Sequence, residues 1–303
     1  QAVQVRFGFG SLVGKTSKML ELYTQTEKVA AARGAVLIQG ESGTGKELVA
    51  KAIHFNSPRT SGPFVVINCG AIPEALQESE LFGHERGAFT GAIATRKGLF
   101  EEAHGGSLFL DEVAEMAPGL QAKLLRALQD GEIRRVGGTK TLRVDARVIA
   151  ATNHDLAADV REGRFREDLF YRLNVFPLFL PPLRERREDL PLLVDHFLDR
   201  LAREGQGALK RLSPEALRAM MAYGWPGNVR ELEHAIERAV LLSEGDTVGP
   251  QDLPPEILAP TDELTVILPD AAVSLKETMA RVIRDAEARL IRRALAQSGN
   301  NRT

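Results

Sequence analysis

Five short apolar runs, separated by stretches with helical spacing, constrain the fold of this chain more than any other feature. Each run has the length of a buried strand, and KELVAKAIHF and PGLQAKLLRALQD between them have the spacing of helices. Strands that alternate with helices are typical of a doubly wound parallel sheet. We therefore expect an α/β fold with a five-stranded parallel sheet flanked by helices. The predicted strands are AVLIQG (35–40), FVVIN (64–68), SLFLDE (107–112), ARVIAAT (146–152) and VFPLFL (175–180).

The strand signal ends near residue 182, and helical patterns follow. Three segments have helical spacing: REDLPLLVDHFLDRLARE, SPEALRAMMAY and NVRELEHAIERAVLL. Ser213 followed by Pro214 is a typical N-cap and first-turn pair. GDTVGPQDLPPEILAPTDEL is Pro-rich and acidic, which is typical of a linker. The expected boundaries are 1–10 for the end of an N-terminal linker, 11–182 for the α/β core, 183–245 for a small α-helical lid and 246–272 for a linker.

Composition narrows the class of protein. The chain has 303 residues, of which 44% are hydrophobic and 26% charged, as in ordinary globular proteins of roughly two domains. The net charge of -2 gives no global basic field that would indicate nucleic acid. Cys69 is the single cysteine, which excludes an intramolecular disulfide, fits a reducing compartment and is expected to be a small buried filler. Because no apolar run approaches the roughly 20 residues of a membrane span, we expect a cytoplasmic protein.

A phosphate-binding loop is predicted between the first strand and the first helix after it. The pattern G-x-x-x-x-G-K begins at Gly40, and its glycines let backbone N–H groups converge on phosphate at a helix N-terminus. Lys46 would reach the outer phosphates. Glu47 stands where a Ser or Thr is usual, and the hydroxyl of that residue is a ligand of Mg²⁺. Thr44 or a water must therefore supply this ligand. The residues expected to form this phosphate site are Gly40, Glu41, Ser42, Gly43, Thr44, Gly45, Lys46 and Glu47.

A Gly-rich turn without a ligand is the alternative interpretation of this loop. The strand before it and the helix after it favour the phosphate loop, because the motif requires that context. A second Gly-Lys-Thr, at residues 14–16, lacks both the earlier glycine and a preceding strand. We therefore predict a single phosphate loop.

Carboxylates and amides end three of the predicted strands, where open parallel sheets bind their ligands. Asp111 would hold Mg²⁺ directly or through a water, and Glu112 would act as the general base on the attacking water. Asn68 ends the second strand and could hold a carboxylate idle until it is needed. Thr152 and Asn153 could sense the terminal phosphate or orient the water, although a turn or an N-cap for the next helix is a competing interpretation.

The segment Gly87-Ala88-Phe89-Thr90-Gly91-Ala92 is unsuited to a strand or a helix interior. It has glycines towards both ends, small residues and a Phe-Thr pair at its centre. Glycines provide hinge freedom, and Phe89 provides an apolar contact that can detach. An ordinary Gly-rich surface loop has a similar composition. The residues alone therefore predict a flexible loop between two nucleotide-reading motifs.

With these motifs the chain resembles the central AAA+ domain of bacterial enhancer-binding proteins, the NtrC-like activators of sigma-54 RNA polymerase. The resemblance covers roughly residues 10 to 245. GAFTGA is its most specific part, because generic AAA+ ATPases lack it, and a glutamate after the phosphate-loop lysine is common in the family. The motifs that carry it are GESGTGKE, ELFGHERGAFTGA, GGSLFLDE, RFREDLFYRLNVFPLFLPPLRER and WPGNVRELEH.

The resemblance implies roles that the residues alone do not assign. Residues 87–92 would be the tip of a mobile loop that contacts sigma-54, and residues 130–145 would form a second, hairpin-like insertion. Asn68 would restrain the catalytic glutamate. Arg166 and Arg172 would reach into the neighbouring subunit's site, although their charged surroundings also fit a solvated face. Arg230 would sense the nucleotide from the lid.

The resemblance also implies an activity and partners. We expect an ATPase that turns over Mg-ATP to ADP and phosphate in a ring of six or seven copies and remodels the sigma-54 RNA polymerase holoenzyme. A motor for another protein or nucleic-acid client, and a scaffold that binds ATP without using hydrolysis, remain alternatives. Residues 273–303 contain a helical pattern that resembles the start of a truncated Fis-like DNA-binding domain. We expect a piece of a longer protein, with enhancer DNA a partner of the full-length protein only.

Overall fold

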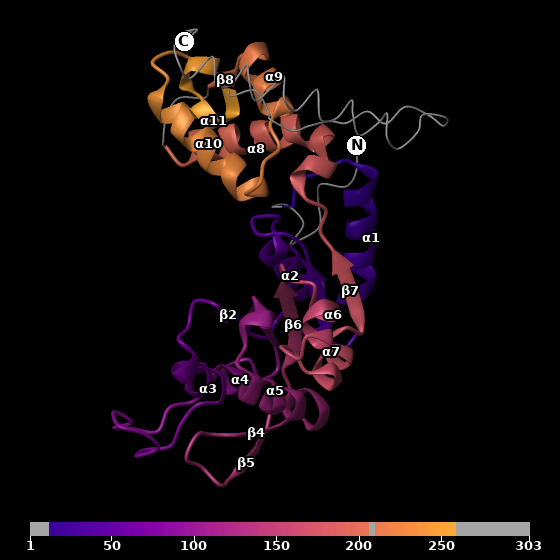
Figure 1. Ribbon diagram of the computed structural model, residues 1–303, viewed down its shortest axis with the longest axis vertical. Helices are drawn as coiled ribbons and strands as arrows, with labels where there is room; N and C mark the ends of the chain where they lie inside the picture. Colours follow the sequence, from indigo (N-terminus) through magenta and orange to yellow (C-terminus); the bar gives the residue numbers. More distant parts are fainter. Residues whose placement is uncertain (1–11, 206–209, 259–303) are drawn as a thin grey trace, which may run out of the picture. The chain divides into compact units, whose positions relative to one another are not determined.

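A five-stranded parallel sheet forms the centre of the larger part of the molecule. The computed structural model describes residues 12–205 and 210–258 (Figure 1). Its strand order is β2-β3-β6-β1-β7, and all neighbouring pairs are parallel. The predicted α/β class and all five predicted strands are therefore confirmed. The strands are β1 (Val36–Gln39), β2 (Phe64–Asn68), β3 (Ser107–Asp111), β6 (Arg147–Thr152) and β7 (Phe176–Phe179).

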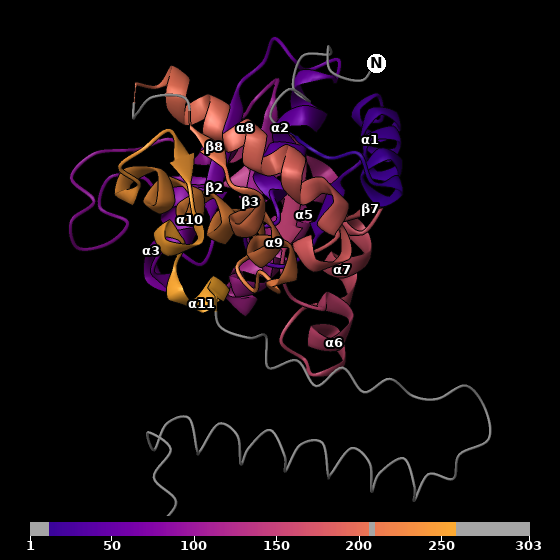
Figure 2. The same ribbon diagram turned by 90° about the horizontal axis from the view of Figure 1, so that it is seen from above.

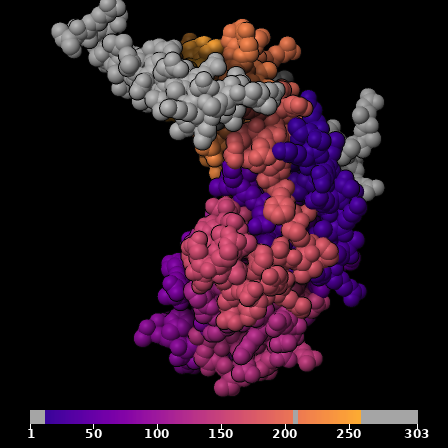
Figure 3. Space-filling model, turned by 45° about the vertical axis from the view of Figure 1, so that its right-hand side comes forward, coloured from indigo at the N-terminus to yellow at the C-terminus, as the bar shows by residue number. Residues whose placement is uncertain are grey.

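Helices cover both faces of this sheet, because the strands are apolar on both sides. Val36 and Ile38 of β1 pack on one face with α1 and α2, whereas Leu37 packs on the other with α3 to α7. Cys69 belongs to the second of these cores and is buried, as predicted. In Figure 3 the indigo surface of α1 adjoins the surface of the segment that contains β7, and these two elements are in contact. The helices are α1 (Ser17–Ala30), α2 (Lys46–Phe55), α3 (Glu74–Phe82), α4 (Leu99–Glu102), α5 (Pro118–Asp130), α6 (Leu156–Arg161) and α7 (Glu167–Leu173).

A helical unit follows the sheet, with a core of its own. The helices α8 and α10 lie side by side in it (Figures 1 and 2). Trp225 is fully buried at its centre, and its indole N–H donates to the Met220 carbonyl oxygen at 2.9 Å. Ser213 caps α9 through a bond from the Ala216 N–H, as predicted. The elements are η2 (Leu183–Glu185), η3 (Arg187–Asp189), α8 (Leu190–Arg203), β8 (Arg211–Leu212), α9 (Pro214–Ala222) and α10 (Asn228–Leu242).

The helical unit extends beyond the predicted boundary at residue 245. The strand β9 (Thr247–Val248) pairs with β8, and it is followed by η4 (Pro250–Asp252) and α11 (Pro255–Leu258). Val248, Leu253 and Ile257 are buried in the core of the unit. The first part of the expected linker at 246–272 is therefore folded chain, because three apolar side chains anchor it. The rest of that linker, the residues 1–11 and the segment 273–303 lie outside the described residues.

Two insertions interrupt the α/β core. One is the loop between α3 and α4, and the other is a hairpin of β4 (Glu132–Arg134) and β5 (Thr141–Arg143), which pair antiparallel. The hairpin predicted at residues 130–145 is thus confirmed as a structural element. A short 3-10 helix, η1 (Val113–Glu115), follows β3. Across residues 12–205 and 210–258, no helix combines the length and the apolar character that crossing a membrane requires.

Candidate active site

The loop between β1 and α2 is built around the Lys46 side chain. Its ammonium group donates to the carbonyl oxygens of Gly40 at 2.8 Å and Glu41 at 3.0 Å, and the Thr44 hydroxyl donates to the same Glu41 oxygen at 2.8 Å. The N-terminus of α2 has no side-chain cap, and Gly45 before it has a φ of 104°. The positive end of the helix dipole and its N–H groups are thus available to an anion. This loop fits a polyphosphate.

The tips of β2 and β3 bring three polar side chains together. The register places Asn68 directly opposite Asp111. The Asn68 amide donates to Asp111 Oδ2 at 3.4 Å, and the Glu112 N–H donates to Asp111 Oδ1 at 3.0 Å. Glu112 has a φ of 52°, in the left-handed region that is costly for a residue with a side chain. A strained acidic residue at the carboxyl end of a buried strand is typical of a functional position.

Lys46 and Asp111 influence each other's charge. Burial lowers the pKa of the Lys46 ammonium group, and the carboxylates of Asp111 and Glu112 oppose this shift. Burial raises the pKa of the Asp111 carboxyl group, and Lys46 opposes that shift in turn. Each group therefore favours the charged form of the other.

Asn68 contacts a different carboxylate from the one expected. Its amide N–H bonds to Asp111, and its carbonyl oxygen accepts from the Ala71 N–H at 3.0 Å. The Glu112 carboxylate lies against Gly70, so closely that a Cβ there would be 2.4 Å from Glu112 Oε2. The strand register explains the difference, because it places Asp111, and not Glu112, opposite the amide.

The tip of β6 reaches the phosphate loop through its backbone. The carbonyl oxygen of Thr152 accepts from the Gly40 N–H at 3.2 Å, while the Thr152 hydroxyl accepts from the His154 N–H at 3.0 Å. Asn153 is exposed beside it. The cap of the next helix, α6, is the Asp155 side chain, which accepts from the N–H groups of residues 157 and 158. The competing N-cap role therefore falls to Asp155 and leaves Asn153 without it.

Asn228 is a residue of this site that sequence reasoning missed. It is fully buried, its amide donates to the Ser42 carbonyl oxygen at 3.0 Å and to Glu41 Oε2 at 3.2 Å, and its own oxygen accepts from the Leu183 N–H at 2.8 Å. The N–H groups of the next two residues donate to the Gly43 carbonyl oxygen. The start of α10 is therefore bonded to the phosphate loop at several atoms.

Two arginines extend the contact between the helical unit and the loop. Arg184 places its guanidinium on both oxygens of Glu41, at 2.8 and 2.6 Å, and these hydrogen bonds lower the pKa of the Glu41 carboxyl group. Arg230 is exposed, and its guanidinium lies 3.4 Å from the Ser42 hydroxyl. The structure thus places Arg230 at the phosphate loop.

Arg166 and Arg172 lie on the exposed surface of the α/β core. The Arg166 guanidinium pairs with the Asp168 carboxylate, and the Arg172 guanidinium donates to the Leu128 carbonyl oxygen at 3.0 Å. These contacts lie on α7 and α5 and not on the phosphate loop of the same chain. One chain therefore brings together the loop, the strand tips and Arg230, but not these two arginines.

The loop of residues 87–92 is held at its base and open at its tip. The Gly87 N–H donates to the Ala92 carbonyl oxygen at 2.8 Å, and Ala92 is buried. Phe89 is 40% exposed and meets the His84 ring edge to face, with centroids 5.0 Å apart. Thr90 is exposed. The Phe-Thr pair is therefore presented at the surface.

The hairpin and the loop support each other. The backbone of Val136 pairs with both Gly83 and Glu85, at 2.9 and 3.0 Å. Arg135 of the hairpin donates to Glu85 at 3.0 Å and to Glu101 of α4 at 2.7 Å. A cavity of about 420 Å³ lies between α3, α5 and the hairpin, away from the phosphate loop. The two insertions therefore form one connected surface.

Comparison with known proteins agrees with this arrangement. Residues 12–179 match the sigma-54 interaction domain, and residues 184–266 match the AAA+ ATPase lid domain. Regulatory protein AtoC of Escherichia coli K12 is 50% identical over 305 residues, which cover 100% of this chain and 65% of AtoC. Nitrogen fixation protein VnfA of Azotobacter vinelandii is 56% identical over 259 residues, which cover 86% of this chain and 50% of VnfA.

A solved structure is similar over most of the chain. The crystal structure of NtrX from Brucella abortus in complex with ATP has a TM-score of 0.77 and 41% identity, and the match covers 90% of this chain and 61% of NtrX. The chain thus spans between half and two thirds of the length of these relatives.

Proposed function

The chain belongs to the family of sigma-54 interaction domains with an AAA+ lid, and from this premise we propose that it is the ATP-hydrolysing part of a cytoplasmic sigma-54 activator. It binds Mg-ATP, hydrolyses it to ADP and phosphate, and uses the turnover to remodel the closed complex of sigma-54 RNA polymerase. The observation that carries the proposal is the assembly of Lys46, Asp111 and Glu112 at one edge of the sheet. The ATP complex of NtrX supports the choice of nucleotide.

The phosphate loop holds the nucleotide in this proposal. The N–H groups of residues 43–47 and the Lys46 ammonium group bind the phosphates, and Asp111 would hold Mg²⁺. Because the Thr44 hydroxyl donates to the Glu41 carbonyl oxygen and its side chain is buried, a water is the better candidate to replace the hydroxyl ligand that a Ser or Thr at position 47 would supply. The metal ion neutralises charge on the phosphate oxygens when it is bound.

Glu112 is the general base in the proposal. Its carboxylate accepts a proton from the attacking water, and the backbone at this position has the positive φ of a strained residue. Asn68 orients Asp111 in the described structure. If Asn68 bonded to Glu112 instead, it would hold this carboxylate away from the attacking water. Thr152 and Asn153 sense the terminal phosphate. They lie at the tip of β6, which is separated from the Asn68 strand β2 by β3.

The active site is completed by a neighbouring copy of the chain. Arg166 and Arg172 are exposed on the surface and reach the neighbour's nucleotide in a ring of six or seven copies. An arginine delivered in this way contributes about 10³–10⁵ in rate in other phosphoryl-transfer systems. Arg230, on the helical unit, contacts the nucleotide of its own chain through its place beside Ser42.

In this proposal the loop at residues 87–92 contacts sigma-54 and moves it as ATP is turned over. Residues 69–73 join the tip of β2 to α3, and α3 ends at the base of this loop. A shift of Asn68 would reach Phe89 and Thr90 through this helix. Enhancer DNA is a partner of the full-length protein only.

Three substitutions separate the steps. Lys46→Ala should abolish nucleotide binding, and Glu112→Gln should bind ATP without hydrolysing it. Thr90→Ala should retain ATPase activity and lose transcription activation. Normal activation by Thr90→Ala would mean that the loop is not the contact with sigma-54, which would favour a motor for another client.

The first experiment is ATPase rate against protein concentration, with capture of sigma-54 in a trapped ADP–metal-fluoride state. A steep rise in specific activity, together with capture in the trapped state only, is the expected result. Turnover that is independent of concentration, without capture, would contradict both the shared site and the loop. Nucleotide binding without any turnover would favour an assembly scaffold.

A further inference from the structure

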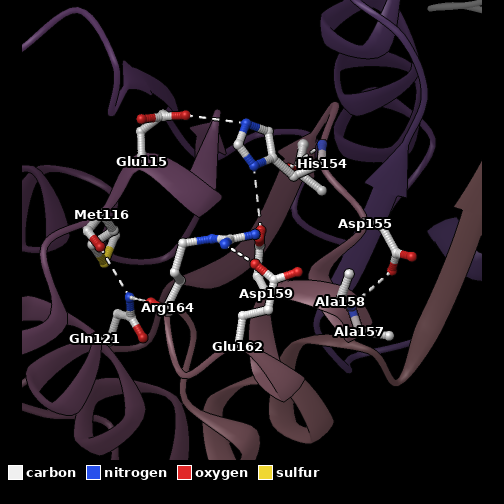
Figure 4. Close-up of polar contacts among 11 residues, drawn as sticks. Glu115, Met116, Gln121, His154, Asp155, Ala157, Ala158, Asp159, Glu162 and Arg164 are labelled. Carbon is white, nitrogen blue, oxygen red and sulfur yellow. Dashed lines mark hydrogen bonds and ion pairs between the residues drawn. The ribbon is translucent and has the colours of Figure 1, made fainter.

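A cluster of charged side chains lies beyond the tip of β6. His154 stands between two carboxylates: its Nε2 is 3.2 Å from Glu115 Oε1 and its Nδ1 is 3.3 Å from Asp159 Oδ2 (Figure 4). Glu115 belongs to η1, which follows the tip of β3, and Asp159 belongs to α6. The imidazole therefore connects the segment after β3 to the helix after β6.

The two contacts of this bridge differ in kind. The contact with Asp159 is a hydrogen bond, in which the ring N–H donates because a carboxylate only accepts, and the contact with Glu115 is at ion-pair distance. Asp159 is almost fully buried, with 6% of its side chain exposed, whereas Glu115 and His154 are partly exposed. A buried carboxylate is costly unless cations or donors surround it, and His154 supplies one of them.

Asp159 also pairs with the guanidinium of Arg164, only two residues before Arg166. The Arg164 side chain donates to Asp159 Oδ1 through Nε at 3.0 Å and pairs with Glu162 as well. The backbone N–H groups of residues 164 and 165 donate to the Asp159 carbonyl oxygen, at 2.9 and 3.2 Å. Asp159 therefore fixes both the backbone and a side chain of the segment that leads into α7.

Gln121 holds the same segment from the opposite side. It is fully buried, and its amide donates to the carbonyl oxygens of Met116 at 3.0 Å and Arg164 at 3.1 Å (Figure 4). Its oxygen accepts from the Arg166 N–H at 2.9 Å. The backbone at Arg166 is thus tied to the chain just after η1.

We propose that His154 is a positioning residue that, with Asp159 and Gln121, fixes the segment carrying Arg166 relative to the tips of β3 and β6. The inference rests on the proposed function, because it concerns the arginine that a neighbouring copy receives. Its distinct content is that His154 acts in trans: it serves the site of the next subunit and not the nucleotide of its own chain. Loss of the bridge leaves the Arg166 side chain present but misplaced.

A subunit-mixing experiment tests this placement. Rings are formed from two inactive variants, Glu112→Gln, which keeps its arginines, and Arg166→Ala, which keeps its own site. Mixing restores ATPase activity wherever a Glu112→Gln subunit donates Arg166 to an Arg166→Ala neighbour. His154→Ala is then added to one variant or the other.

The two placements should differ. His154→Ala in the Glu112→Gln subunit should lower the restored rate by about tenfold or more, because a small misplacement of a reacting group can cost up to about 10²-fold. His154→Ala in the Arg166→Ala subunit should leave it within about twofold. An equal loss in both placements, or a loss only in the second, overturns the inference.

Controls separate this result from other failures. Asp155→Ala removes the cap of the same helix without touching the bridge, so it should not reproduce the trans loss. Glu115→Gln keeps the fold, because this side chain is half exposed, and should give a smaller loss in the same direction. If the mixture of Glu112→Gln and Arg166→Ala, without His154→Ala, restores no activity, the shared site is wrong and the inference fails with it. If activity is restored and His154→Ala changes it in neither subunit, only the inference is wrong.

Discussion

The phosphate loop and the loop at residues 87–92 each contain two glycines with positive φ, but only Gly43 of the phosphate loop is crowded by its neighbours. Gly43 has a φ of 75°, and a Cβ on it would lie 2.2 Å from the Gly227 carbonyl oxygen. Gly87 and Gly91 have φ values of 81° and 106°, and a Cβ on either would meet nothing within 4 Å. Gly43 is needed because the helical unit packs against its backbone. Gly87 and Gly91 are needed only for their positive φ.

This difference separates a loop that is held by many contacts from one that has few. At the phosphate loop, the backbone of Gly43 is bonded to the start of α10, and Asn228 fixes Ser42 and Glu41. The loop at residues 87–92 has hydrogen bonds near its base and an exposed tip. Few buried contacts and exposed backbone are the physical basis of local mobility.

The largest effect is expected for Gly43→Ala. The new methyl group meets a backbone oxygen that cannot turn aside, so the helical unit must move away from the loop. Positive φ alone costs about 1–2 kcal/mol for a non-glycine residue. We expect loss of detectable nucleotide binding by calorimetry and a fall of about 10²-fold or more in turnover.

Gly105→Ala is the matched control for this prediction. Gly105 has a φ of 77° and open space around it, so its substitution adds backbone strain without the clash. A fall in ATPase activity as large for Gly105→Ala as for Gly43→Ala would mean that strain, and not contact with the helical unit, sets the effect.

Gly70→Ala should have the next largest effect and should sharpen the comparison. Its Cβ would lie 2.4 Å from Glu112 Oε2, which is the end of a flexible side chain, so the chain folds and the carboxylate moves. A displaced general base lowers kcat by about 10- to 100-fold while ATP affinity stays unchanged. Steady-state kinetics measure this, with Gly119→Ala as the control, since a Cβ there meets nothing within 4 Å. A change in KM alone would contradict it.

Gly87→Ala should leave the ATPase almost untouched. The only cost is the backbone strain of a non-glycine residue at positive φ, about 1–2 kcal/mol. The open loop relieves this strain by changing shape. We expect turnover within about twofold of the original and a several-fold loss of sigma-54 capture in the trapped nucleotide state. A loss of turnover comparable to that of Gly43→Ala would break the comparison.

The smallest effect is expected for the chemical reactivity of the Cys69 thiol. Burial raises the pKa of the Cys69 thiol to about 12, so at pH 8 only about one molecule in 10⁴ carries the reactive thiolate. The native chain should therefore resist a maleimide reagent, and reactivity should appear only as pH approaches that value or on unfolding. Thr90→Cys should add one fast-reacting thiol, counted by mass spectrometry. Rapid modification of Cys69 in the native chain would show that the region beside Asp111 opens readily.

Much of the sheet could be predicted from the sequence, because each strand is a local apolar run. The same holds for Lys46, Asp111 and Glu112, since each stands at a fixed offset from such a run. The order of the strands depends on which strands pair, and the partner of Asn68 depends on the register between β2 and β3. A pattern along one strand contains neither.

Contacts between distant segments were the part that sequence patterns could not supply. Asn228 bonds to Ser42 across 186 residues, and no local signal links the two. The segment around Val248 and Leu253 has the composition of a linker, yet its few apolar residues pack into the helical core. His154 follows the strand tip as an ordinary polar residue in the sequence, and its contacts with Glu115 and Asp159 exist only in the folded chain.

The single tryptophan gives the molecule an internal optical probe. Trp225 is fully buried in the helical unit, two residues before the Gly227 carbonyl that faces the phosphate loop. Its fluorescence emission should therefore be shifted to short wavelength in the native protein and report on the helical unit and on its junction with the phosphate loop. Comparing its melting curve with that of the far-ultraviolet circular dichroism would measure how far the two units unfold as one.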